Sequence, residues 1–267
     1  MLRFRRRPPQ DDEELKTPPP PEDDGHELRM SILEHLDELR KRLLRAFLAL
    51  VVGTTVGIVV AEPVLAYLLQ PYADLYPEGR QLVVLGPTGS VVAYFRVALL
   101  VGGILAIPII TYQVLMFVLP GLTRTERRYV IGSLLPITLL FLIGVAFAWL
   151  VLMPPAISFL EGFQADIFEP EWTADQYLSF VTSLLFWMGV AFETPLVFFV
   201  LSLLGFVTGG VLVRNWRIAI VGAAVAAAFI TPTIDPVNMF LVMGPLLGLY
   251  VFSILLVVIG TRLARPA

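Results

Sequence analysis

The chain has no cysteine and only two histidines, His26 and His35, in its 267 residues. Without cysteine it can form no disulfide, thiol nucleophile or thiolate-bound metal site. Both histidines lie near the N-terminus, so a histidine metal site or proton relay within the later, apolar part of the chain is excluded too. The sequence therefore predicts no metal and no cofactor.

Charge is also scarce. Charged residues make up 15% of the chain and hydrophobic residues 57%, with a mean hydropathy of +0.80. Soluble domains carry about 25% charged residues, so a soluble enzyme of this size is nearly ruled out. The length fits a bundle of about six membrane helices of about 20 residues each.

Motifs of hydrolases and nucleotide-binding enzymes are missing. The chain has no H-E-x-x-H, G-x-S-x-G, Walker A or G-x-G-x-x-G sequence. These absences favour a binder, channel or carrier over an enzyme, and nothing indicates nucleic-acid binding.

Composition divides the chain into three parts. Residues 1–29 are rich in proline and charge and predict a disordered cytoplasmic tail. Residues 30–260 carry the apolar segments and predict an all-α, polytopic membrane domain. Residues 261–267 form a short second cytoplasmic tail.

The membrane domain begins with an amphipathic helix, predicted over residues 31–44. Ser31 and Glu34 form a capping box. Glu38 and Arg42 stand four residues apart with the acid first, the favourable order for an ion pair on a helix. We expect this helix to lie on the membrane surface and to run straight into the first span.

Six spans are predicted, with both termini on one side, and the fifth and sixth are expected to be short. Their ranges are Ala46–Leu69, Val91–Leu119, Tyr129–Met153, Tyr177–Phe206, Trp216–Ile230 and Val237–Ile259. Pro154 and Pro155 are expected to end the third span.

The basic residues orient this topology. Of the 19 Lys and Arg residues, only Arg80 and Arg96 fall on the side opposite the termini. By the positive-inside rule both termini are cytoplasmic. The expected location is the plasma (inner) membrane. No internal repeat supports an inverted-repeat transporter.

Glu193 lies near the middle of the fourth span, where a carboxylate costs about 2.5–3.5 kcal/mol on insertion scales. It must face the bundle interior, a wet cavity or a partner. One reading is a protonated glutamate bonded to a neighbouring helix; a functional role is the favoured reading.

Glu38 and Glu126 each have a structural and a functional reading. Glu38 can be a solvated acid paired with Arg42, and Glu126 can complete a capping box with Thr123. Taken singly, the structural readings are favoured. Together, on one face, the two carboxylates could instead bind a ligand that carries two guanidinium groups.

Four segments resemble the TatC family, the multispanning receptor subunit of the twin-arginine (Sec-independent) protein translocase. They are His35–Leu43 (HLDELRKRL), Pro108–Arg128 (with PIITYQ, FVLPGL and ERR), Tyr177–Pro195 (with YLSF and GVAFETP), and Thr231–Pro236 (TPTIDP). The resemblance covers about residues 30–258, with the motifs in order.

The resemblance implies a function. TatC-like proteins recognise the paired arginines of export signal peptides and work with TatA- and TatB-like single-span proteins. They transport folded proteins with the proton-motive force, and association with further copies is compatible with the family. Residue by residue, the family's signal-peptide site falls on Glu38, Glu126, Phe117 and Arg40, and its intramembrane or partner-contact positions fall on Glu193, Pro71, Thr231 and Asp235.

Two alternatives were weighed beside this reading. A secondary transporter or channel for a small solute would use Glu193 as its ion or proton site, but one mid-span acid without a repeat gives little support. An intramembrane hydrolase would need a second catalytic group beside Glu193, and the chain offers none.

Overall fold

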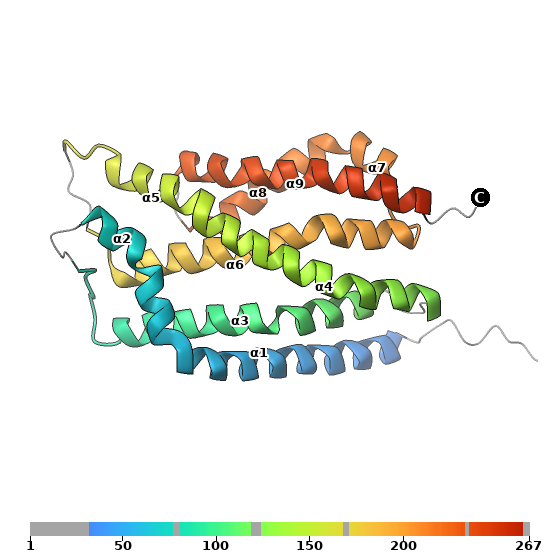
Figure 1. The fold of residues 1–267 in the computed structure, drawn as a ribbon, viewed down its shortest axis with the longest axis horizontal. Helices are drawn as coiled ribbons and strands as arrows, with labels where there is room; N and C mark the ends of the chain where they lie inside the picture. Colours follow the sequence, from blue (N-terminus) through green and yellow to red (C-terminus); the bar gives the residue numbers. More distant parts are fainter. Residues whose placement is uncertain (1–31, 77–80, 119–123, 168–170, 233–234, 264–267) are drawn as a thin grey trace, which may run out of the picture.

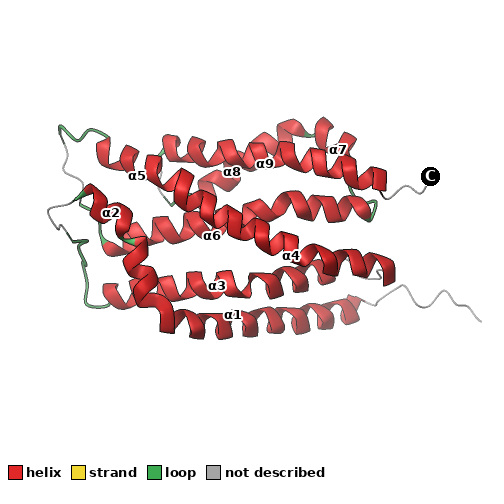
Figure 2. Cartoon of the chain, in the orientation of Figure 1, coloured by secondary structure: helices red, strands yellow, loops and turns green. Residues whose placement is uncertain are grey.

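The computed structural model describes residues 32–76, 81–118, 124–167, 171–232 and 235–263. Within these ranges the regular secondary structure is helical, with loops between the helices (Figure 2) and one isolated β-bridge. The elements are α1 (Ile32–Leu68), α2 (Gln70–Leu75), α3 (Gly89–Val118), α4 (Arg124–Phe147), a π-helical turn (Ala148–Leu152), α5 (Met153–Gly162), α6 (Ala174–Leu203), α7 (Gly209–Arg214), α8 (Trp216–Ile230) and α9 (Pro236–Leu263). The all-α prediction is confirmed for the described residues.

Helix α1 combines two predicted elements. The amphipathic segment and the first span form one uninterrupted helix of 37 residues. Its charged first turns therefore continue into the apolar turns without a break. In its last part α1 changes direction and turns toward α2 (Figure 1), and Pro63 lies inside the helix.

Helix α6 lies at the centre of the bundle. It packs against α3, α4 and α9, while α1 packs on α3 and α8 packs on α9 (Figure 1). The largest fully buried side chains include Tyr177, Phe180 and Met188, all on α6. The core therefore forms around this one apolar helix.

Small residues bring α1 and α3 into close contact. A Cβ added to Gly53 would lie 2.5 Å from the carbonyl oxygen of Gly102, and one added to Gly57 would overlap the carbonyl of Ala98. Backbones can approach this closely only where side chains are minimal, as at the small-xxx-small interfaces of membrane helices. Gly53 and Gly57 therefore fix the register of α1 against α3.

The third span differs from its prediction. Pro154 and Pro155 do not end it, because α5 continues to Gly162. Both prolines lie in the first turn of α5, directly after the π-helical turn. A π turn changes the hydrogen-bond register, so the helix proceeds past residues that would otherwise break it.

The last two spans differ in length. Helix α8 has 15 residues, about 22 Å along its axis, which confirms the short fifth span. Helix α9 has 28 residues, so the prediction of a short sixth span is wrong. The helix continues beyond Ile259 to Leu263, past the end of the apolar run, and Arg262 in the last turn stabilises the helix C-terminus.

The end of the bundle opposite the termini is closed by the loops and short helices. Val83 pairs with the segment before α6: its amide donates to Trp172 O at 3.1 Å and its carbonyl accepts from the Ala174 amide at 2.9 Å. Tyr177 donates to Leu68 O at 2.8 Å, and Tyr76 donates to Glu161. These bonds tie α1, α5 and α6 together at this end.

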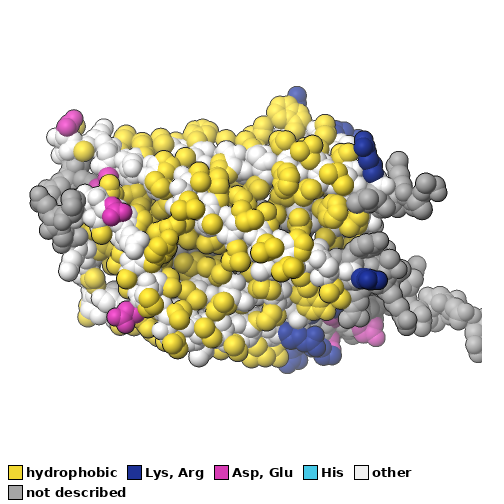
Figure 3. Space-filling model, viewed as in Figure 1, with side chains coloured by type: hydrophobic (Ala, Val, Ile, Leu, Met, Phe, Trp, Pro, Cys, Tyr) yellow, Lys and Arg dark blue, Asp and Glu magenta, His cyan; other side chains and the backbone are white. Residues whose placement is uncertain are grey.

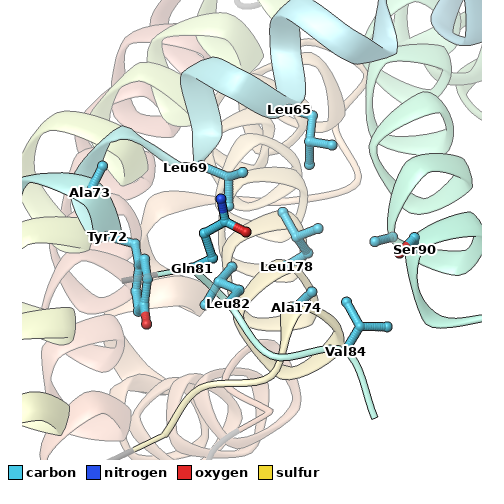
Figure 4. Close-up of a pocket in the computed structure, with 11 residues that line it drawn as sticks. Leu65, Leu69, Tyr72, Ala73, Gln81, Leu82, Val84, Ser90, Ala174 and Leu178 are labelled. Carbon is cyan, nitrogen blue, oxygen red and sulfur yellow. The ribbon is translucent and has the colours of Figure 1, made fainter. Parts of the chain in front are cut away.

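A cavity of about 410 Å³ lies beneath this closed end (Figure 4). Its walls come from the end of α1, from α2, from the segment around Leu82, and from the starts of α3 and α6, among them Leu65, Tyr72 and Leu178. The lining is mainly apolar. The cavity is far from the basic end described next.

Charged and apolar side chains separate along the bundle. Large apolar side chains are exposed along the long helices, and the view in Figure 3 shows them between ends that carry the charges. Lys and Arg gather where α1 begins and α9 ends, beside the acids of the first turns of α1, whereas the opposite end carries Asp and Glu in this view. Among the described residues, five helical segments are long and apolar enough to cross a membrane, and α8 is a shorter apolar helix.

Candidate signal-peptide site at the basic end

Glu38 and Arg42 form a partly buried ion pair on α1. The Arg42 Nε donates to Glu38 Oε1 at 2.8 Å, and Nη2 donates to the same oxygen. The Glu38 side chain is 20% exposed and that of Arg42 is 16% exposed. By contrast, the neighbouring Asp37–Lys41 pair is 54% and 66% exposed. The two pairs have the same spacing, yet only the Glu38 pair is enclosed.

The second oxygen of the Glu38 carboxylate is unpaired within the part of the chain that the structure describes. Oε2 is buried and accepts no hydrogen bond from the described residues. A buried unpaired carboxylate oxygen costs about 1–3 kcal/mol or more. Glu38 is therefore more than a solvated acid in a helix-surface pair, the reading that its spacing alone favoured.

Phe117, at the end of α3, lies against the start of α1. Its ring stacks on His35 with a centroid distance of 4.6 Å and an interplanar angle of 15°. His35 precedes Glu38 by one helical turn on α1. The structure thus brings Phe117 beside the helix face that carries Glu38.

Two further predicted residues lie on this end. Arg40 is exposed on α1. Glu126 belongs to the first turn of α4, which begins at the same end of the bundle as α1 (Figure 1), but its side chain lies outside the described residues. Its capping role and its distance from Glu38 therefore stay predictions.

A cavity of about 400 Å³ opens beside the Glu38 pair. Its described lining is charged and comes from α1 alone: Glu34, Asp37, Glu38, Lys41, Arg42 and Arg45. The lining holds three acids and three bases, so a cationic ligand would find carboxylates whose charges are already partly balanced.

Glu193 is buried at the contact between α6 and α3, with 8% of its surface exposed. Thr111 on α3 reaches both carboxylate oxygens, at 3.1 Å and 3.3 Å. The expectation that Glu193 faces the bundle interior is confirmed. Each helix has a proline close by, Pro108 before Thr111 and Pro195 after Glu193.

The other three predicted residues stabilise helix ends. Pro71 lies in the first turn of α2, directly after α1 ends. Thr231 is 4% exposed and its hydroxyl donates to Ala227 O at 2.8 Å, at the end of α8. Asp235 precedes α9 and accepts from the Asn238 amide at 2.7 Å and from its side chain at 3.0 Å. None of the three lies with the Glu38 pair.

Sequence reasoning did not single out Arg42, His35, Thr111 or Gln113 as site residues. Gln113 is 8% exposed and its Oε1 has no partner among the described residues. For Thr111 and Gln113, the available signal was the placement of polar residues in an otherwise apolar span. In the part of the chain that the structure describes, no group of three His, Cys, Asp or Glu could hold a metal ion.

These features define a class. A helical bundle with apolar side chains exposed between a basic and an acidic end is a polytopic membrane protein. Residues 34–245 match the family model described as Sec-independent protein translocase protein (TatC). The chain belongs to the TatC family, whose members are subunits of the twin-arginine protein translocase.

Relatives and solved structures agree with this assignment. The chain is 36% identical to the Sec-independent protein translocase protein TatC of Synechocystis sp., over 84% of this chain and 86% of that protein. It is 37% identical to the chloroplastic TATC of Pisum sativum, over 83% of this chain and 62% of the longer plant protein. A crystal structure of the twin-arginine translocase receptor TatC superposes with a TM-score of 0.76 at 37% identity, covering 86% of this chain and all of that one.

Proposed function

We propose that this chain is the receptor of a twin-arginine translocase and binds the paired arginines of export signal peptides at its basic end. Glu38 takes one guanidinium and Glu126 the other, with Phe117 and Arg40 beside them. Binding of the signal is followed by transport of the folded client with TatA- and TatB-like single-span partners and the proton-motive force.

One observation supports the binding site above all. Among the described residues, one buried carboxylate oxygen of Glu38 is unpaired, while the other accepts hydrogen bonds from the guanidinium of Arg42. The Glu38 carboxylate therefore already binds one arginine side chain, and its Oε2 could accept a hydrogen bond from a second. A planar guanidinium matches a carboxylate better than an ammonium does.

The orientation follows from charge. The end that carries Arg40, Arg42 and Arg262 would face the cytoplasm of the plasma membrane by the positive-inside rule. Signal peptides emerge on that side. Glu193, Pro71, Thr231 and Asp235 then act within the bundle or at contacts with partners, away from the arginine site.

Crosslinking of a twin-arginine signal peptide tests the site. Glu38→Ala and Glu126→Ala should each weaken crosslinking to the full-length protein in membranes and leave its membrane insertion intact. Asp37→Ala is the matched control, because Asp37 forms the exposed pair one residue earlier. Unchanged crosslinking in both glutamate variants would refute the assignment.

Export of a twin-arginine reporter tests the wider function. A strain that lacks this gene should fail to export the reporter, and the wild-type chain should restore export. A small-solute transporter would instead give flux in proteoliposomes that contain this chain alone.

A further inference from the structure

Arg96 is the one charged residue in the sequence of α3, a helix long and apolar enough to cross a membrane. It is the eighth residue of the helix, so about 10 Å of α3 precede it at the acidic end of the bundle. A charged side chain in a membrane-spanning segment is costly and is usually paired or functional. Arg96 therefore calls for an explanation.

Arg96 contacts Asp175 at the start of α6. Its Nη1 donates to the Asp175 carbonyl oxygen at 3.2 Å, and its Nη2 lies 3.1 Å from Oδ1 of the carboxylate. The Arg96 side chain is 30% exposed and that of Asp175 is 55% exposed. An exposed ion pair contributes little to stability. Both charges of this pair stay accessible to a further ligand.

A groove of about 240 Å³ begins at this pair. Its lining runs from Arg96 along α3 to Gly103 and along α6 from Thr182 to Trp187, and Leu50 of α1 completes it. Helices α3 and α6 both begin at the acidic end (Figure 1), and the α6 lining starts seven residues after Asp175. The ion pair therefore marks the outer end of the groove, which continues toward the middle of the bundle.

The deeper part of this groove is mainly apolar. Leu99 and Leu100 follow Arg96 on α3, and Phe186 and Trp187 face them from α6. A Cβ added to Gly103 would lie 2.9 Å from the Phe186 ring, so the two helices pack closely there. A charged mouth above an apolar groove fits an elongated amphiphile that carries its charges at one end.

We propose that the Arg96–Asp175 pair and this groove bind one phospholipid whose headgroup is zwitterionic and ends in a primary amine. The lipid phosphate accepts hydrogen bonds from the Arg96 guanidinium, a pairing that is strong because both groups are charged. The ammonium group donates to the Asp175 carboxylate. One acyl chain lies in the groove. The site is at the opposite end of the bundle from Glu38 and does not depend on the proposed function.

Charge complementarity selects this headgroup. The pair offers one cation and one anion, and a zwitterion matches both. An anionic headgroup such as phosphoglycerol pairs with Arg96 but brings no cation to Asp175, whose carboxylate repels it. Phosphocholine carries a cation without an N–H donor, so it forms no hydrogen bond with Asp175. Phosphoethanolamine should therefore bind more tightly than either of the other two.

Native mass spectrometry of the purified full-length protein tests this preference. The protein is reconstituted in vesicles with equal amounts of phosphatidylethanolamine, phosphatidylcholine and phosphatidylglycerol, all with the same acyl chains, and is then extracted. One phosphatidylethanolamine should be retained, in about tenfold excess over each of the others, because it alone adds a charge-assisted hydrogen bond. Preferential retention of phosphatidylglycerol, or equal retention of all three lipids, would overturn the proposal.

Two variants assign the roles of the two charges. Asp175→Asn should abolish the preference for phosphatidylethanolamine over phosphatidylcholine and raise retention of phosphatidylglycerol, because the repelling carboxylate is gone. Arg96→Gln should lower retention of all three lipids. Arg217→Gln is the matched control, since Arg217 is an exposed arginine on α8 whose guanidinium lies over the Trp216 ring, 5.6 Å from its centroid. It should retain phosphatidylethanolamine as the wild type does. An unchanged lipid preference in Asp175→Asn, or wild-type retention in Arg96→Gln, would refute the site.

Discussion

Replacing Gly53 by alanine probes the contact that aligns α1 with α3. The new Cβ would lie 2.5 Å from Gly102 O and 3.2 Å from the Gly102 Cα. Carbon and carbonyl oxygen normally approach no closer than about 3.3 Å, so the helices must separate by nearly 1 Å. The obstacle is backbone on a packed helix and cannot rotate away.

The expected cost follows from two opposing terms. Alanine is favoured over glycine within a helix by about 1 kcal/mol. Overpacking a tight contact costs about 1–3 kcal/mol, and the separation also weakens neighbouring contacts along the seam. Gly53→Ala should therefore destabilise the protein by about 1–2 kcal/mol net.

Gly222→Ala is the matched control, because its added Cβ on α8 would meet no other part of the described structure within 4 Å. Gly222→Ala gains the same helix propensity without a steric overlap with a neighbouring helix. Thermal unfolding of the purified proteins, followed by tryptophan fluorescence, gives the comparison. The reasoning is refuted if Gly53→Ala is as stable as Gly222→Ala. Binding of the signal peptide should fall in Gly53→Ala alone, since Glu38 and Phe117 lie on the two separated helices.

Two further substitutions test individual hydrogen bonds by the same unfolding assay. Thr111→Val keeps the side-chain shape but removes the donor to the buried Glu193. We expect it to lower the free energy of unfolding by about 1–3 kcal/mol. A free energy of unfolding equal to that of the wild type would mean that the bond does not stabilise the fold. Asp235→Ala removes the cap of α9 and should lower the free energy of unfolding by about 0.5–2 kcal/mol. Asp235→Asn keeps a capping oxygen and should lower it less. Equal losses in the two variants would argue against capping.

The sequence predicted the helices well, because apolar runs of bilayer length are a strong local signal. The fifth span was predicted at Trp216–Ile230, the bounds that α8 has. Errors arose where local signals mislead. Pro154 and Pro155 predict a helix end, and only the π-helical turn before them, which has no clear sequence signature, allows the helix to continue.

The site was predictable in part. The burial of Glu193 followed from the cost of a mid-span carboxylate, but its donor Thr111 did not, because that contact joins residues 82 positions apart. The spacing of Glu38 and Arg42 alone favoured a solvated ion pair, and only the resemblance to the TatC family predicted that Glu38 is a site residue. Whether the side-chain oxygens of Glu38 and Gln113 are buried depends on how α1 packs against α3. That packing cannot be predicted from the local sequence of either helix.

The π-helical turn also sets where α5 points. One extra residue per turn rotates everything after it by about 100° around the helix axis. Glu161 follows the turn and accepts the hydroxyl of Tyr76, which stands just beyond α2. Without the inserted residue, Glu161 would face a different quadrant of the bundle and the bond would be lost. The π-helical turn at Ala148–Leu152 thus sets the rotation of α5 relative to α4. Because of this rotation, α4 packs on α6 while α5 bonds the segment after α2.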